Sequence, residues 1–260
     1  MNRRHVSTKL HFVFAVVMCL LLFVAETFGQ TATSQPSSEG WQFQIIPYLW
    51  GTSMGGRIGV GDRTADVDAS FRNVLDHLHF AFMNLADATW NNKLVLLTDL
   101  VYSDLRGFRA APGPIFSSVS PNQKLFLLTP EGGYRMLDNS QASVDILGGI
   151  RYWHLNTELQ FQPGLRPGID VQGTRGWVDG ILGLRGKAYL PKKWWISGYG
   201  DLGGGGSNLT YQIIGTAGVD IHTHYALVLG YRYLNVGYDK DHFLFDTALK
   251  GPLFGFTFKF

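Results

Sequence analysis

Long runs in which apolar and polar residues alternate recur through this chain, and they constrain its fold more than any other feature. Successive side chains of a β-strand point to opposite faces, so such a run predicts a strand whose two faces meet different surroundings. Ten runs of this kind follow Gly40, and together they predict an all-β chain. They cover residues 41–50, 80–90, 93–105, 124–136, 142–155, 177–190, 194–203, 209–221, 225–236 and 252–260.

The connections between these runs fall into two classes that take turns along the chain. Tight ones cover 91–92, 137–141, 191–193 and 222–224. Longer ones cover 51–79, 106–123, 156–176 and 237–251, with a short one at 204–208 in the same series. Short turns on one side and long loops on the other are typical of an outer-membrane barrel. The pattern predicts a transmembrane antiparallel up-and-down β-barrel of ten strands, with both termini on the short-turn, periplasmic side.

The two faces of the runs differ in a way that favours a membrane over water. Residues 225–233 place Tyr225, Leu227 and Leu229 on one face and Arg232 on the other. Asn84 fits less well, because it shares its face with phenylalanines. A soluble β-sandwich also alternates, but its outer face should carry many charges. Charged residues are only 16% of this chain, well below the roughly 25% of globular domains. Tyr and Trp near the run ends suit the aromatic girdles of a barrel.

The last run ends on four phenylalanines at two-residue spacing, Phe254, Phe256, Phe258 and Phe260. They would share the lipid-facing side of a strand, with Lys259 on the lumenal side. A terminal Phe with aromatics at alternate positions also resembles the assembly signal that the barrel-insertion machinery reads. Outer-membrane lipid and that machinery are therefore the expected partners, and the barrel is expected to be a monomer.

The first 29 residues are expected to be a cleaved secretory signal peptide. A basic start, Arg3, Arg4 and Lys9, precedes an apolar run at 12–25 and a small residue, Gly29, at a plausible cleavage point. A lipoprotein signal at Cys19 is disfavoured by Met18 before it and by apolar residues after it. Residues 30–40 would form a flexible lead, and 41–260 the barrel. This organisation predicts export through the secretory pathway to the outer membrane of a Gram-negative bacterium.

The net charge and the distribution of charges argue against a nucleic-acid partner. Residues 1–29 hold three of the 22 basic and one of the 20 acidic residues, so the remaining chain is neutral overall. With no basic patch or stripe, no nucleic-acid partner is expected. The only cysteine lies in the signal peptide, so the mature chain has no disulfide.

Alternation also predicts which charges point into the barrel. They are Asp87, Asp99, Glu131, Arg135, Asp145, Arg151, Asp179, Arg185, Lys187, Asp201, Asp220, Arg232 and Lys259. Charges away from bulk water need partners, so these residues could form ion pairs that fill the barrel. They could also line a narrow or gated passive channel. About eight strands leave room only for side chains, and ten is close to that limit, so a wide pore is not expected.

The long connection 51–79 leaves the strand number open. Residues 57–61 and 63–71 could form a hairpin above the barrel, followed by a short helix at 71–78. A hairpin within the wall would raise the count to twelve strands. The segment could instead fold inward as a plug.

Motifs that carry chemistry elsewhere are in unsuitable contexts here. Residues 51–55, GTSMG, match a hydrolase elbow, but no helix follows Ser53. Residues 198–203, GYGDLG, match a dinucleotide fingerprint within an alternating run. His222 and His224 fall in a turn and lack the further ligands of a metal site; Asp76, His77 and His79 are similar. We expect no catalytic residue, cofactor or metal. A rim enzyme and a loop-mediated surface binding protein are the alternatives.

Several stretches resemble an uncharacterised family of outer-membrane β-barrel proteins of Gram-negative bacteria, which is broadly porin-like or similar to the small outer-membrane barrel superfamily. They are PYLWG (47–51), RTADVDASFRNVLDHLHFAFM (63–83), GGIRYWHLNTEL (148–159), GWVDGILGLRGK (176–187), GYGDLGGGG (198–206) and LVLGYRYLNVGY (227–238). The resemblance covers most of the mature chain. It implies the fold and the location, and it assigns no activity to any residue.

Overall fold

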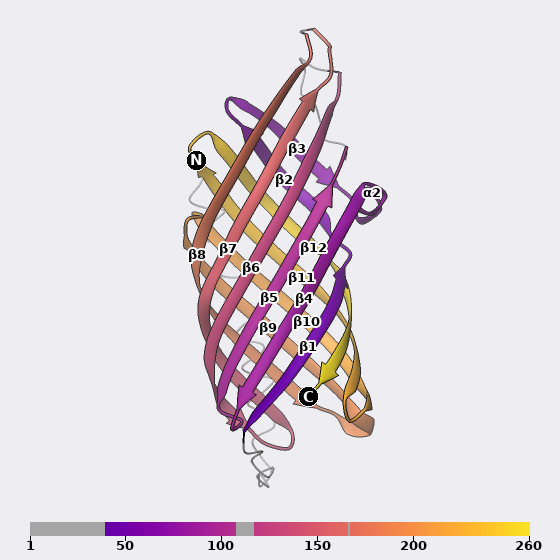
Figure 1. The fold of residues 1–260 in the computed structure, drawn as a ribbon, viewed down its shortest axis with the longest axis vertical. Coiled ribbons are helices and arrows are strands. Elements are labelled where there is room, and N and C mark those ends of the chain that lie inside the picture. The colour runs from indigo at the N-terminus through magenta and orange to yellow at the C-terminus, as the bar shows by residue number, and fades with distance from the viewer. Residues whose placement is uncertain (1–39, 108–116, 166) are drawn as a thin grey trace, which may run out of the picture.

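The computed structural model describes residues 40–107, 117–165 and 167–260. The expected signal peptide and nearly all of the expected lead lie outside the described residues. The described chain is almost entirely β-structure (Figure 1). Its strands are β1 (Trp41–Trp50), β2 (Ser53–Val60), β3 (Arg63–Ala69), β4 (Leu78–Trp90), β5 (Leu94–Leu105), β6 (Val119–Asp138), β7 (Ala142–Phe161), β8 (Ile169–Tyr189), β9 (Trp194–Gly205), β10 (Leu209–His222), β11 (Tyr225–Lys240) and β12 (Phe243–Lys259). Its helices are α2 (Phe71–Asp76) and a 3-10 turn, η2 (Pro191–Lys193).

Ten of these strands close into an antiparallel barrel. Pairing runs from β1 to β4 and then in chain order to β12, which pairs back with β1. This confirms the ten-stranded up-and-down barrel. Among the described residues no helix is long and apolar enough to cross a membrane.

The other two strands, β2 and β3, form a hairpin, which is one of the possibilities left open for the connection 51–79. Along β12, β2 continues the pairing that β1 begins: Trp50 lies opposite Leu253, and Ser53 lies opposite Lys250. The hairpin is therefore joined to the edge of the sheet rather than folded inward as a plug. Pairing of β1 with β4 ends earlier, where Pro47 lies opposite Asn84. Above that point the short helix α2, capped by the Ser70 side chain, occupies the flank of the barrel (upper right in Figure 1).

Two of the expected long loops, 156–176 and 237–251, were wrong. Most of both is strand, since β7 runs to Phe161, β8 begins at Ile169, and β11 meets β12 across Asp241 and His242. The third, 106–123, is shorter than expected, because its last five residues belong to β6, which begins at Val119. Asp241 and His242 have φ of 52° and 58°, the left-handed conformation of a tight hairpin turn. The turn at Asn91–Asn92, between β4 and β5 at the other end of the barrel, uses the same conformation.

The strands were underestimated because their apolar face changes sides part-way along. We call the half of the barrel nearer the C-terminus the lower half. In the lower part of β7 the outward side chains are Val144, Ile146 and Ile150, and the inward ones include Asp145 and Arg151. In the upper part the buried inward positions are Trp153, Leu155, Leu159 and Phe161, and the outward positions are His154, Asn156, Glu158 and Gln160.

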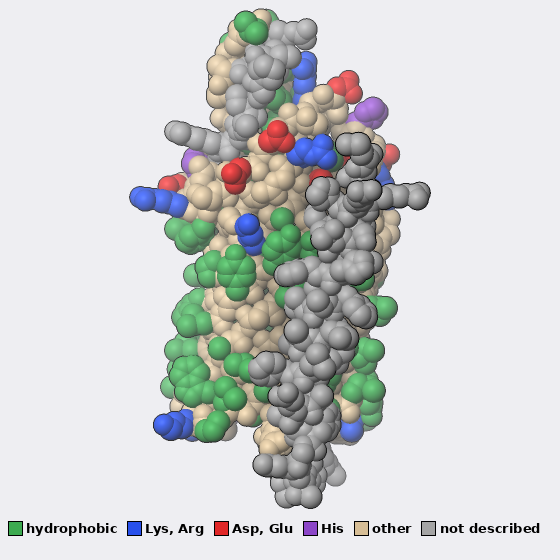
Figure 2. Space-filling model, turned by 180° about the vertical axis from the view of Figure 1, so that it is seen from behind, with side chains coloured by type: hydrophobic (Ala, Val, Ile, Leu, Met, Phe, Trp, Pro, Cys, Tyr) green, Lys and Arg blue, Asp and Glu red, His purple; other side chains and the backbone are tan. Residues whose placement is uncertain are grey.

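The surface follows the same division. Hydrophobic side chains cover the lower part of the visible face, and charged ones gather over the upper part, with further basic residues at the lower rim (Figure 2). The lower half is therefore apolar outside and partly polar inside, as in a membrane barrel. The upper half is apolar inside and polar outside, as in a water-soluble β-protein.

A continuous apolar core lies in the upper interior. Its large side chains without exposed surface include Ile58, Leu127, Trp153, Leu155, Leu159, Leu234 and Phe245. The Trp153 and Trp177 rings stack at 5.6 Å between centroids, and Tyr238 stacks on Trp177 at 4.0 Å. Such aromatic contacts stabilise a core beyond the area they bury.

Candidate functional site

The interior charges lie below this core, and strands far apart in the sequence supply them. Asp99, Glu131, Asp145, Arg151, Asp179, Asp201 and Arg232 are buried. Most of the sequence-predicted lumenal charges have partners on other strands, and several of those strands are not neighbours in the sheet. The contacts form a lower network, a middle layer and a pair at the lower rim.

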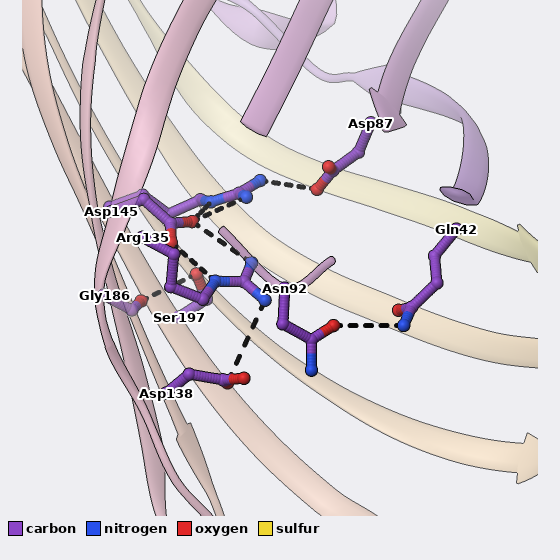
Figure 3. A network of polar contacts seen from close by, with 9 residues as sticks. Gln42, Asp87, Asn92, Arg135, Asp138, Asp145, Gly186 and Ser197 are labelled. Atoms are coloured by element: carbon purple, nitrogen blue, oxygen red, sulfur yellow. Dashed lines mark hydrogen bonds and ion pairs between the residues drawn. The ribbon is translucent and has the colours of Figure 1, made fainter. Parts of the chain in front are cut away.

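The lower network is centred on Arg185 of β8. Its guanidinium donates to the Asp87 carboxylate of β4 at 2.6 Å and, through Nε, to Asp145 of β7 at 2.8 Å. Arg135 of β6 donates to the same Asp145 at 2.8 Å and approaches Asp138 at 4.0 Å (Figure 3). Because β4 and β8 are not adjacent, the Arg185–Asp87 contact crosses the barrel interior.

The middle layer contains a second pair between strands that are not adjacent, here β7 and β9 on either side of β8. Arg151 of β7 donates to both carboxylate oxygens of Asp201 on β9, at 3.0 and 2.6 Å, and to the Thr210 hydroxyl at 3.1 Å. Gln212 also donates to Asp201, at 3.2 Å. Neither charged side chain has any exposed surface. Two-point contacts of this kind are among the stronger hydrogen bonds of proteins.

Arg232 of β11 completes the middle layer. It lies 2.9 Å from the Asp99 carboxylate of β5 and donates to the Tyr48 hydroxyl of β1 at 2.8 Å. That hydroxyl in turn donates to Asp99 at 2.6 Å. The guanidinium also lies 4.6 Å from the ring centroid of Trp50, a cation–π contact. This cluster links β11 to β1 and β5 near the seam at which β1 pairs with β12.

Further contacts involve the remaining predicted charges. Glu131 accepts a hydrogen bond from Tyr199 at 2.9 Å. Asp179 accepts from the Trp177 indole at 3.1 Å and from the Ser207 backbone N–H at 2.6 Å. Lys259 pairs with Asp220 at 2.7 Å, at the lower rim.

Lys187 has a different kind of partner. Its ammonium lies 4.1 Å from the ring centroid of Trp195, a cation–π contact.

A polar chamber of about 230 Å³ lies among these groups in the lower half. Gln44, Ser143, Ser197, Arg185 and Lys259 line it, together with parts of the middle layer. Above that layer, the apolar core replaces polar side chains. The arrangement can hold water and small polar solutes in the lower half, and it places packed hydrocarbon between them and the upper end.

Sequence reasoning missed several uncharged members of the site. Tyr48, Tyr199, Thr210 and Gln212 all bind its charges. Each occupies an inward position of its strand, so extending the inside–outside assignment to polar uncharged residues would have found them.

The motifs that resemble a hydrolase elbow, a dinucleotide fingerprint and a metal site lie in separate places in the structure. The Ser53 hydroxyl donates to the Lys250 carbonyl within a strand pair, and residues 198–203 lie within β9. His222 and His224 lie at the turn between β10 and β11, at the same end as the C-terminus. His79 lies 3.6 Å from Asp104. Within the part of the chain that the structure describes, no three His, Cys, Asp or Glu side chains gather as metal ligands would.

Comparison with known proteins agrees with this architecture. The outer membrane protease OmpT from Escherichia coli aligns over 89% of this chain and 99% of its own, with a TM-score of 0.54 and 9% identity. The chain has the fold of an outer-membrane β-barrel. At that identity the likeness concerns the fold alone, and the protease activity belongs to OmpT.

Other barrels align less closely. Ail of Yersinia pestis aligns over 86% of this chain and 100% of its own, with 13% identity and a TM-score of 0.38. An anion-selective porin from Comamonas acidovorans aligns over 84% of this chain and 59% of its own, with 12% identity and a TM-score of 0.30. No family model matches the sequence, and a search of curated proteins found no match.

Proposed function

We propose that this protein is a non-enzymatic outer-membrane β-barrel whose interior is closed to ions and solutes. In this proposal residues 1–29 direct export and are removed. The lower half spans the membrane with its short turns in the periplasm, and the upper half stands in the extracellular medium. The interior charges hold the barrel in shape.

Strand length and surface character support this placement. A membrane-spanning strand needs about 9–11 residues, whereas β7 has 20 and β8 has 21. About half of each strand is therefore free to project, and the projecting part carries polar residues outside. Phe254, on the outer face of the last strand, and Phe260, directly after that strand, are exposed, so lipid would solvate them and the insertion machinery would read them.

The apolar core of the upper interior is the observation that carries the closed state. Leu127, Trp153 and Phe245 have no exposed surface there, so a passing ion would have to displace packed side chains. Below them Arg151 and Arg232 are also fully enclosed. A narrow or gated channel would need this whole layer to move.

Cysteine labelling in cells tests the placement, since the mature chain contains no cysteine of its own. Asp170 lies on the upper outer face and Lys192 in a lower turn, and both are exposed. A bulky membrane-impermeant maleimide should label Asp170→Cys on intact cells, and Lys192→Cys only after the outer membrane is opened. The opposite result, or equal labelling of both on intact cells, would overturn the placement.

A further inference from the structure

The wall of the barrel has a gap on one side, and an apolar cavity lies behind it. The cavity occupies about 340 Å³ between the upper end of β1, helix α2 and β4. It begins where β1 stops pairing with β4, beyond Pro47 and Asn84. Trp50, Met54, Val101, Leu125, Leu249 and Phe245 are among its lining residues. A dry apolar cavity of roughly 150 Å³ is enough to bind benzene, so this space can hold a larger apolar molecule.

The mouth of this cavity lies on the face that would meet lipid. Leu49, Leu229 and Phe254 belong to the lining and are 66%, 61% and 49% exposed. They form one row across β1, β12 and β11, because Phe254 lies opposite both of the others. Leu75 of α2 is also part of the lining and is exposed. An apolar rim of this kind opens toward the membrane rather than toward water.

The far side of the cavity carries a buried amide. Gln123 lies on β6, two strands beyond β4 in the sheet order, and is only 1% exposed. Neither its amide oxygen nor its amide nitrogen has a hydrogen-bond partner among the described residues, and the same holds for the Trp50 indole nitrogen. A buried polar group without a partner costs about 1–3 kcal/mol, so a molecule that pairs with this amide would be favoured.

We propose that the cavity binds a small neutral amphiphile, a hydrocarbon chain with one hydroxyl or carbonyl group, which enters sideways from the membrane. The proposal rests on the membrane placement given above. The chain would pack among the apolar lining, and its polar group would pair with the Gln123 amide.

Two features of the cavity select this class of ligand. None of the described residues that line it is charged, so an ionised head group would be buried there without a counter-ion from them, which is strongly unfavourable. A phospholipid acyl chain would bring a terminal methyl to Gln123 and leave the amide unpaired. A single chain that carries its own donor or acceptor satisfies both conditions.

Quenching of Trp50 by a chain-brominated decanol tests the proposal, because bromine quenches indole fluorescence on contact. The mature protein, refolded into phospholipid vesicles and checked by a heat-dependent gel shift, should show a saturable component of quenching. Trp50→Phe should remove that component. Linear, unsaturable quenching would overturn the proposal.

Two substitutions locate the site. Ala81→Phe fills the cavity and should weaken binding at least tenfold, whereas Ala88→Phe on the same strand lies outside the lining and should leave it unchanged. Gln123→Leu should weaken decanol binding about tenfold, the loss of roughly one hydrogen bond, without weakening the binding of brominated decane. Equal binding of brominated decanol by the wild type and by Ala81→Phe would contradict the assignment of the site to this cavity.

A lipid control separates this ligand from the bilayer itself. Vesicles made with chain-brominated phosphatidylcholine should quench Trp50 without a component that Ala81→Phe removes. If they show that component, the occupant is a lipid chain and the small-amphiphile proposal fails. The cysteine labels at positions 170 and 192 report the membrane placement separately, so failure of placement and failure of binding are distinguishable.

Discussion

Arg151 and Asp201 form a two-point ion pair with a shortest distance of 2.6 Å, and neither side chain has any exposed surface. They belong to β7 and β9, which β8 separates in the sheet. The pair therefore links non-adjacent strands across the interior. A charge held this way cannot serve a hydrated ion path without breaking the pair, which favours a structural role.

Breaking this pair should be costly. Removing one partner of a buried ion pair costs about 3–5 kcal/mol, because the other charge stays buried alone. We expect Asp201→Asn to lower the free energy of unfolding by about that amount, measured by urea titration in lipid vesicles. Replacing both partners, Arg151→Met with Asp201→Leu, should restore most of the loss. If the losses of unfolding free energy from the two substitutions simply added in the double variant, the two residues would not be directly coupled.

A more exposed pair serves as the matched comparison. Lys259 and Asp220 lie 2.7 Å apart, with side chains 27% and 32% exposed. Exposed pairs contribute about 0–1 kcal/mol, so Asp220→Asn should change the unfolding free energy by no more than that. A loss as large as that of Asp201→Asn would show that burial does not set the cost.

The lower network should behave as a unit centred on Arg185. Arg185→Gln leaves Asp87 without an ion-pair partner, while Asp145 keeps Arg135. We expect this variant to destabilise the barrel and Asp87→Asn, added to it, to restore part of the loss by removing the unpaired charge. Urea unfolding of the two single variants and the double variant measures the coupling. If the Asp87 carboxylate is already solvated, adding Asp87→Asn to Arg185→Gln should recover none of the lost stability. That result would contradict the coupling.

Asp104, a carboxylate near the upper end of β5 that is only 5% exposed, should show a pH effect. Hydrogen bonds from Arg106 hold the pKa of Asp104 below its ordinary value. Because the folded-state pKa is the lower one, the stabilisation is present above the unfolded pKa and is lost as the pH falls through the folded pKa. We expect Arg106→Gln to raise the pKa of Asp104. An NMR titration of the Asp104 carboxyl measures this change. An unchanged titration would contradict the contact.

The last residue should matter more for assembly in cells than for folding in lipid. Phe260 is 72% exposed at the end of the chain, so Phe260→Ala removes little packing. We expect it to reduce the folded fraction in the outer membrane, measured by heat-dependent gel shift, while refolding into vesicles stays near wild type. Leu202→Ala, another exposed outward change, is the control and should assemble normally.

The sequence predicted the lower half of the barrel well and the upper half poorly, for one physical reason. Where lipid lies outside, alternation such as Val144 to Ile150 has its apolar face outward, and the ten strands follow from it. Above Tyr152 the outside is polar and the inside apolar, so a search for an outward apolar face ended the strands too early. The alternation of apolar and polar residues continues above that point. A search for alternation that did not require the apolar face to point outward would have detected it.

Which interior charges pair with one another could not be predicted from the sequence. Inward position followed from the two-residue period, but the pairing of Arg185 with Asp87, 98 positions apart, depends on strand tilt and closure. The gap beside α2 likewise arises from where β1 leaves β4. Neither follows from local patterns.

Single-channel conductance in a planar bilayer tests most directly whether the interior is closed. The protein without residues 1–29, with folding confirmed by a heat-dependent gel shift, should give no current steps. A variant with Leu127, Trp153 and Phe245 replaced by Ser should give steps, which would show that the protein inserts and that the apolar core is the barrier. Stable steps from the wild type, with an ion selectivity that Arg185→Gln alters, would instead show a conducting channel lined by the interior charges.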